Sequence, residues 1–226
     1  MKKNVKKVTI MVTLIISFCV LMALIDGVYK ADYFIKSIIK FVMFLILPAI
    51  YSFFDKDIKI KDVFIPKKSG LKQSIFLCIF VYALILGGYF FLKDVFDFSS
   101  ITTSLTNNIG VTGNNFIFVS LYISFVNSLL EEFFFRGFAF ITLKRIANRK
   151  FAYLFSAAVF AVYHIAMMIG WFSVGAFLII MVGLFVGGLL FNYLNEKSST
   201  IYPSWFVHMF ANFAINTIGF ILFGII

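Results

Sequence analysis

Seven long apolar runs, separated by short polar segments, dominate this sequence of 226 residues. The runs cover about Val8–Ile25, Ser37–Phe54, Ser74–Leu92, Asn115–Leu143, Phe151–Ile169, Val174–Leu194 and Tyr202–Ile226. Because the hydrocarbon core of a bilayer requires about 20 apolar residues per helix, each run is long enough to cross a membrane. The sequence therefore predicts an all-α, polytopic transmembrane helix bundle. We expect seven spans, or eight if the last run breaks near Gly219.

The composition excludes most other classes of protein. Hydrophobic residues make up 62% of the chain and charged residues 13%, whereas soluble domains average about 45–50% and 25%. A soluble globular domain, a disordered chain and a coiled coil are all excluded. The net charge of +10 could suggest a nucleic-acid partner, but the basic residues cluster in short segments between apolar runs. That pattern is typical of membrane proteins, so we expect the lipid bilayer as a partner and no nucleic acid.

Two features at first suggest a cleaved signal peptide and a thiol or disulfide site. The N-terminal lysines followed by an apolar run resemble a signal peptide, but the run is too long and lacks a small-residue cleavage site. We interpret it as an uncleaved first span. The two cysteines, Cys19 and Cys78, fall in separate runs and form neither a CxxC site nor a disulfide framework. We expect both to be buried packing residues.

The polar segments predict an orientation. The N-terminal tail, the segment 55–72 and the segment 144–150 are rich in lysine and arginine, whereas Lys93–Asn114 carries a net charge of −1 and is rich in Ser, Thr and Asn. Basic segments stay on the cytoplasmic side. We therefore expect a cytoplasmic N-terminus, an outside loop at Lys93–Asn114 and, with seven spans, a C-terminus outside.

The fourth run contains an unusual group of charges, Glu131, Glu132 and Arg136. Each charged residue at a helix centre costs roughly 2.5–3.5 kcal/mol on insertion scales, so these three must face a protein interior or a wet cavity. Glu132 and Arg136 are four residues apart and can pair on one helix face. Glu131 points about 100° away and is expected to be unpaired, which suits a general acid or base.

Both histidines of the chain also lie inside apolar runs. Phe160 and His164 share a helix face, as do His208 and Asn212. A single histidine in an apolar helix is usually a packing residue. Here, however, both histidines and two of the three glutamates fall in three different spans, so we expect them to meet in one cavity. The third, Glu196, is expected to lie in a loop and to be dispensable.

These three motifs together resemble one family. Glu131-Glu132-x-x-x-Arg136, Phe160-x-x-x-His164 and His208-x-x-x-Asn212, in this order on three membrane helices, resemble the CPBP family. That family contains the CAAX prenyl proteases and bacterial relatives called Abi or bacteriocin-processing proteins. All three motifs are present without substitution, and the resemblance covers about residues 115–215. It divides the chain into N-terminal membrane helices with an outside loop, 1–114, and a catalytic core, 115–226.

The resemblance implies an intramembrane endopeptidase and assigns roles to the motif residues. Glu131 would activate the attacking water with the assistance of His164, and His208 with Asn212 would stabilise the oxyanion. Glu132, Arg136 and Phe160 would support the site. The implied substrate is a peptide or a small membrane-associated protein, which need not be prenylated. The implied location is a bacterial plasma membrane, with the site opening toward the cytoplasmic half.

The sequence leaves open whether the site binds a metal, and it allows two other functions. The family has been described both as metal-dependent and as metal-free. The sequence lacks HExxH, a third histidine and a nearby cysteine, which favours no cofactor. Zinc held by Glu131, His164 and His208 stays possible. Intramembrane charges also suit a proton-coupled transporter, although no internal repeat is visible. A non-catalytic immunity or scaffold protein is the third alternative.

The sequence leaves the oligomeric state undetermined. Gly183, Gly187 and Gly188 fit a small-xxx-small packing pattern. We expect this pattern to mark close packing inside the bundle, with a dimer face as the alternative.

Overall fold

The computed structural model describes residues 5–55, 58–67 and 69–226, and this part of the chain is helical with no strand. Seven of its helices are long and apolar enough to cross a membrane, which confirms the predicted fold class. The spans are Val5–Tyr29, Tyr33–Phe54, Leu71–Leu92, Phe116–Ile146, Arg149–Met168, Val174–Ser198 and Tyr202–Leu222. Each begins and ends within a few residues of its apolar run.

Five spans are single regular or nearly regular helices. The first is α1 (Val5–Leu24) ending in the π-helical turn η1 (Ile25–Tyr29). The third is α4 (Leu71–Leu92), and the last three are α9 (Arg149–Met168), α10 (Val174–Ser198) and α11 (Tyr202–Leu222). The second span changes hydrogen-bonding pattern along its length, through α2 (Tyr33–Phe41), η2 (Val42–Ile46) and α3 (Leu47–Phe54).

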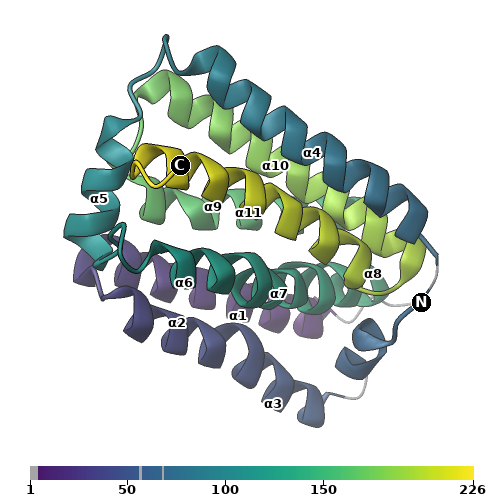
Figure 1. Ribbon diagram of the computed structural model, residues 1–226. Helices are drawn as coiled ribbons and strands as arrows, with labels where there is room; N and C mark the ends of the chain where they lie inside the picture. The colour runs from purple at the N-terminus through teal and green to yellow at the C-terminus, as the bar shows by residue number, and fades with distance from the viewer. Residues whose placement is uncertain (1–4, 56–57, 68) are drawn as a thin grey trace.

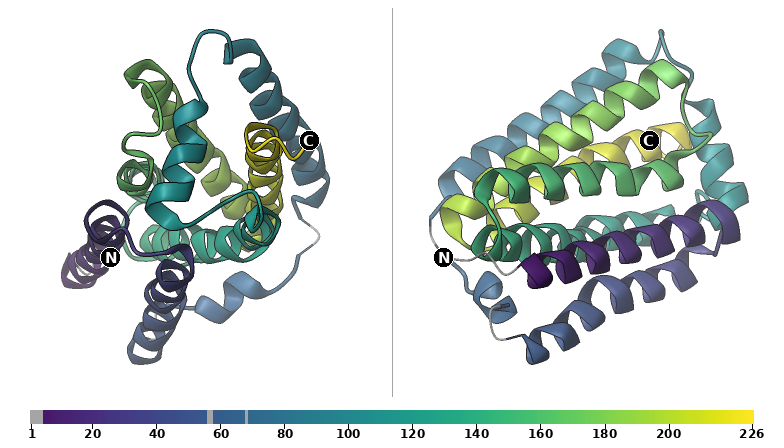
Figure 2. Two further views of the ribbon diagram at one scale, coloured as in Figure 1. Left: turned by 60° about the vertical axis from the view of Figure 1, so that its left-hand side comes forward. Right: turned by 180° about the vertical axis from the view of Figure 1, so that it is seen from behind.

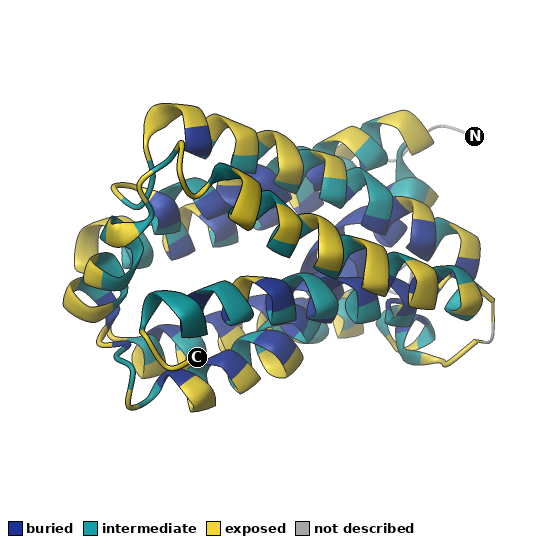
Figure 3. Cartoon of the chain, turned by 45° about the horizontal axis from the view of Figure 1, so that its top comes forward, coloured by how far each residue is buried: buried dark blue, intermediate teal, exposed yellow. Residues whose placement is uncertain are grey.

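The fourth span forms the centre of the molecule. It runs through α6 (Phe116–Leu121), η4 (Tyr122–Asn127), α7 (Ser128–Glu131), η5 (Glu132–Ile141) and α8 (Thr142–Ile146), where η4 and η5 are π-helical. Every residue from Leu130 to Leu143 is buried, so helices cover this segment on all sides. Many large apolar residues are exposed on the outer surfaces of the bundle, as expected of surfaces that contact lipid. Figure 3 draws all exposed residues in yellow.

The N-terminus lies at one end of the bundle and the C-terminus at the other (Figures 1 and 2). The N-terminal end also holds α8 and the short 3₁₀ helix η3 (Ile60–Phe64). There, Ile201 N and Thr200 Oγ1 donate to the Val63 carbonyl at 3.1 and 2.9 Å, which fixes η3 beneath the start of α11. Several lysines counted for the orientation lie outside the described residues: Lys2, Lys3, Lys56 and Lys68.

Glu196 bonds side chains of two other helices at this same end of the bundle. It belongs to α10, so the expectation of a loop position is wrong. Its carboxylate accepts hydrogen bonds from Arg149 Nε and Nη2, both at 2.8 Å, from Tyr153 Oη at 2.7 Å and from Lys144 Nζ at 3.2 Å. These bonds tie the last turn of α10 to α8 and α9. Such a shared carboxylate stabilises helix packing, which argues against the expectation that Glu196 is dispensable.

The segment expected to be an outside loop contains a helix, α5 (Ser99–Ile109). Ahead of it, Asp97 Oδ1 accepts from the Ser99 backbone N–H at 2.8 Å, a bond that lowers the pKa of Asp97. Ser100 Oγ donates to the Trp171 carbonyl at 2.6 Å, so α5 is fixed to the connection between α9 and α10. The run of Ser, Thr and Asn here is therefore an ordered helix.

One glycine marks a close contact between two helices. A Cβ on Gly188 would lie 3.0 Å from Ala157 Cα, so α10 approaches α9 closely at this point. By contrast, Gly183 and Gly187 have nothing within 4 Å of a built Cβ. Only Gly188 therefore fits the expected packing inside the bundle. At Gly219, where the last span could have broken, α11 continues without interruption, which makes seven spans in the described chain.

The two cysteines are free and buried, as expected. Cys19 packs in the large core cluster and Cys78 in a smaller one between α4, α10 and α11. The large cluster is built around phenylalanines of the fourth span. Phe44, for example, stacks on Phe134 with ring centroids 4.1 Å apart.

Candidate active site

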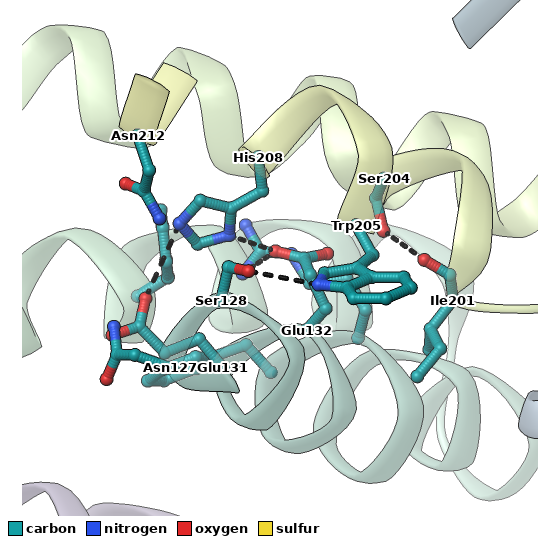
Figure 4. Close-up of polar contacts among 12 residues, drawn as sticks. Asn127, Ser128, Glu131, Glu132, Ile201, Ser204, Trp205, His208 and Asn212 are labelled. Atoms are coloured by element: carbon teal, nitrogen blue, oxygen red, sulfur yellow. Dashed lines mark hydrogen bonds and ion pairs between the residues drawn. The ribbon is translucent and has the colours of Figure 1, made fainter. Parts of the chain in front are cut away.

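The site lies at the junction of α7 and η5, at the centre of the fourth span. Glu131 and Glu132 are 3% and 0% exposed, and α9 and α11 bring His164 and His208 toward them. The close-up in Figure 4 shows Glu131, Glu132, His208 and Asn212 together between α11 and the fourth span. The expected meeting of these side chains in the protein interior is therefore found.

Glu131 faces both histidines. Its Oε2 lies 3.8 Å from His164 Nε2 and 3.8 Å from His208 Nε2. These distances are too long for direct hydrogen bonds, which have N···O separations of about 2.7–3.2 Å. A polar gap of this size suits a water molecule that bridges the groups.

The other ring nitrogen of each histidine is held in place. His164 Nδ1 lies 2.7 Å from the Phe160 carbonyl, and because a carbonyl only accepts, Nδ1 must carry the proton. His208 Nδ1 lies 2.9 Å from Glu132 Oε1. Both rings are thereby oriented with Nε2 toward Glu131, in the way that hydrogen bonds to the far nitrogen orient catalytic histidines.

Glu131 has a partner that the sequence reasoning missed. Lys40 Nζ on α2 lies 2.5 Å from Glu131 Oε1 and 2.5 Å from Asn127 Oδ1, and Asn127 Nδ2 donates to Glu131 Oε1 at 3.1 Å. The expectation that Glu131 is unpaired is therefore wrong. A signal was present, because Lys40 falls inside the predicted second run, and a charge within a span is a functional-site hypothesis by default.

Glu132 pairs with Arg136, as predicted. Arg136 Nη1 lies 3.4 Å from Glu132 Oε1, and both side chains are fully buried. The guanidinium lies over the Phe160 ring at 4.0 Å and over Phe191 at 4.9 Å, a cation–π arrangement. Phe160, which also contacts the His164 ring edge-on, thus forms a platform for the cation behind the site.

Asn212 lies one turn beyond His208 on α11 (Figure 4). Its Nδ2 donates to the Ile123 carbonyl at 3.1 Å. Because an amide NH₂ carries two N–H groups, one donor is used by this bond and a second is available. Nearer the start of α11, Trp205 Nε1 donates to Ser128 Oγ at 3.0 Å, so contacts on both sides of His208 fix α11 against the fourth span.

An apolar groove of about 590 Å³ lies between α2 and the first half of the fourth span. It is lined by Tyr33 and Ser37 of α2 and by Tyr122 and Val126 of η4, among others. Ser37 is about one helical turn from Lys40. The groove extends toward Gly110 beside α5, away from the basic end at which the site was expected to open.

The residues do not form an evident metal centre. In residues 5–55, 58–67 and 69–226, no group of three His, Cys, Asp or Glu side chains is arranged to hold a metal ion. The candidate set, Glu131 with His164 and His208, has separations of 3.8 Å from the carboxylate oxygen to each nitrogen. The Lys40 ammonium already neutralises Glu131. Two ligand atoms of one zinc ion, each about 2.0–2.2 Å from the metal, can lie 3.8 Å apart, so of these features only the Lys40 ammonium counts against a metal ion.

A comparison with protein families identifies the core of the chain. Residues 113–214 match the model of a family described as type II CAAX prenyl endopeptidase Rce1-like. The match confirms that this part of the chain resembles the CAAX prenyl protease family. Searches of curated proteins and of solved structures found no match.

Proposed function

We propose that this chain, whose core matches the Rce1-like CAAX endopeptidase family, hydrolyses a peptide bond in a peptide or small membrane-associated protein. The observation that carries the proposal is the position of Glu131 Oε2, 3.8 Å from Nε2 of both His164 and His208. This places a carboxylate and two imidazoles around one water-sized gap in a buried site, as acid–base hydrolysis requires.

In the proposed reaction, Glu131 Oε2 removes a proton from the water while its oxygen forms a bond to the substrate carbonyl carbon. The carbonyl electron pair moves onto oxygen. His208 Nε2–H and the second N–H of Asn212 donate to that oxyanion, and Glu132, 2.9 Å from His208 Nδ1, holds the ring in place. The C–N bond then breaks, and the proton from Glu131 goes to the leaving amine, with His164 assisting the transfer.

The central test is Glu131→Gln, which keeps the shape of the side chain but removes the base. The purified protein in liposomes would be offered two probes: a quenched peptide with a farnesylated cysteine four residues from its end, and a pool of unprenylated apolar peptides. Products would be identified by mass spectrometry. Because general-base catalysis contributes about 10²–10⁴-fold, we expect cleavage to fall by at least 10²-fold.

Two variants serve as controls. Cys19→Ala and Cys78→Ala change buried thiols in packing clusters outside the site, so both should cleave at the wild-type rate. Cleavage by Glu131→Gln at the wild-type rate would show that the proposed mechanism is wrong. The probe that is cleaved decides whether the substrate is prenylated.

We also propose that the reaction uses no metal. The support is the Lys40 ammonium on Glu131, which adds a positive charge where a zinc ion would need a free carboxylate. Cleavage should be unchanged after dialysis against EDTA and 1,10-phenanthroline. Loss of cleavage that zinc restores would overturn this part of the proposal.

A proton-coupled transporter is the second candidate, and one observation favours it. Besides the charges at the site, the buried pair Lys36–Asp26 lies in the first two spans, with Nζ and Oδ1 2.8 Å apart. Buried ionisable groups in several spans are typical of proton relays. A transporter would acidify liposomes that contain a pH-sensitive dye and would leave both peptide probes intact.

A further inference from the structure

We propose that Lys40 is a positioning residue which, together with Asn127, fixes one carboxylate oxygen of Glu131 and turns the other toward the two histidines. This inference rests on the proposed function. It concerns residues outside the three sequence motifs: Lys40 belongs to the second span, and Asn127 precedes the first motif by one turn.

The two carboxylate oxygens of Glu131 have different partners. Oε1 accepts from Lys40 Nζ at 2.5 Å and from Asn127 Nδ2 at 3.1 Å. Oε2 has no such close donor and faces both imidazoles at 3.8 Å. With Oε1 held by two donors, rotation of the carboxylate about its last bond is blocked, so Oε2 stays at the water-sized gap.

Lys40 is itself held rigidly. The residue is 5% exposed, and its Nζ also donates to Asn127 Oδ1. The ammonium lies over two aromatic rings, at 5.1 Å from Tyr163 and 5.5 Å from Phe44. A buried charge of this kind is stable only with its partner present. The triad of Lys40, Asn127 and Glu131 therefore acts as one preorganised unit.

The chain offers a matched control on the same helix. Lys36 lies one turn before Lys40 on α2, is also buried and forms an ion pair of 2.8 Å with Asp26. The two lysines thus have the same type of partner and similar burial. Only Lys40 contacts a residue of the proposed catalytic group.

The experiment compares Lys40→Met, Lys40→Arg and Lys36→Met in liposomes, with whichever peptide probe the wild-type protein cleaves. We expect Lys40→Met to lower kcat about 10²-fold, as small errors of alignment do, with KM changed less than about threefold. Lys40→Arg should restore at least a tenth of the wild-type kcat because it keeps a cationic donor. Lys36→Met should keep the wild-type kcat.

Melting temperature in detergent separates positioning from folding. Loss of one partner from a buried ion pair is strongly destabilising, so Lys40→Met and Lys36→Met should lower Tm by similar amounts, about 5 °C or more. If Lys40 only stabilised the fold, both variants would lose activity in proportion to Tm. That result, or a wild-type kcat in Lys40→Met, overturns the inference.

Asn127→Leu keeps every charge and removes only the amide that bonds both Lys40 and Glu131. If Lys40→Met does not fold, Asn127→Leu tests the positioning role instead. We expect its kcat to fall at least tenfold, and a wild-type kcat would overturn the inference. The activity of Glu131→Gln separates a failure of the proposed function from a failure of the positioning role of Lys40. If Glu131→Gln cleaves normally, the proposed function fails. If it is inactive while Lys40→Met and Asn127→Leu are fully active, only the positioning role fails.

Discussion

At the scale of single residues, the contact between Glu132 and His208 predicts a second catalytic effect. The carboxylate accepts from His208 Nδ1 at 2.9 Å and so favours a proton on Nδ1 and a fixed ring orientation. Groups that orient a histidine in this way typically contribute about 10–100-fold to activity. We expect Glu132→Gln to lower kcat by that factor with little change in KM, measured with the cleaved probe.

Glu132→Gln also leaves Arg136 as a buried cation without its carboxylate, so the melting temperature must be recorded alongside kcat. Ser156→Ala is a suitable control, because it removes a buried hydroxyl that bonds the Phe135 carbonyl at 2.8 Å but touches neither histidine. Its kcat should be that of the wild type. An equal loss of kcat in the two variants would mean that Glu132 acts only through stability.

Much of the candidate site could be predicted at this scale, and the missing part has a physical reason. Local spacing placed Glu132 and Arg136 on one face, because neighbours on a helix are fixed by its 3.6-residue period. Lys40 and Glu131 are separated by 91 residues. Their contact depends on how α2 packs against the fourth span, which spacing within a helix cannot reveal.

At the scale of helices, the close contact between α9 and α10 carries a prediction about stability. A Cβ on Gly188 would lie 3.1 Å from Ala157 Cβ, whereas a Cβ on Gly187 would have open space within 4 Å. Overpacking a helix interface costs about 1–3 kcal/mol. Gly188→Leu should therefore lower the melting temperature in detergent by several degrees, and Gly187→Leu should lower it much less.

The same pair tests whether helix packing reaches the site. Ala157 precedes Phe160 by one turn on α9, and Phe160 supports Arg136 and contacts His164. Displacement of α10 from α9 should also lower kcat in Gly188→Leu. If Gly187→Leu is the more damaging variant, the outward face of α10 has a contact that the isolated chain does not show, as a dimer would provide.

The helices themselves could be predicted well, because a bilayer leaves few alternatives to a long apolar helix. The hydrogen-bonding pattern within them could not. The π-helical segment η5, Glu132–Ile141, is buried on all sides, so it lacks the alternation of apolar and polar faces from which helix geometry can be inferred. The helix α5 was missed because Ser, Thr and Asn are more typical of loops.

At the scale of the whole molecule, the odd number of spans determines on which side of the membrane each terminus lies. Seven crossings place the N-terminus and the C-terminus on opposite sides of a membrane, and they lie at opposite ends of the bundle (Figure 1). The end near the N-terminus holds Lys144, Arg145 and Arg149. Because basic segments are retained in the cytoplasm, we expect this end to be cytoplasmic and α5 to lie outside.

Cysteine labelling in intact bacterial cells that express the protein would test this orientation. Both native cysteines are buried, so single added cysteines can be read against a low background. Asn107→Cys, on the exposed face of α5, should react with a membrane-impermeant maleimide in intact cells. Lys150→Cys, at the exposed start of α9, should react only after the membrane is opened.

The reverse labelling pattern would place the basic end of the bundle outside. It would also move the apolar groove between α2 and the fourth span, which extends toward α5, from the outer half of the membrane to the cytoplasmic half. The labelling pattern therefore decides which side of the membrane supplies a substrate that uses this groove.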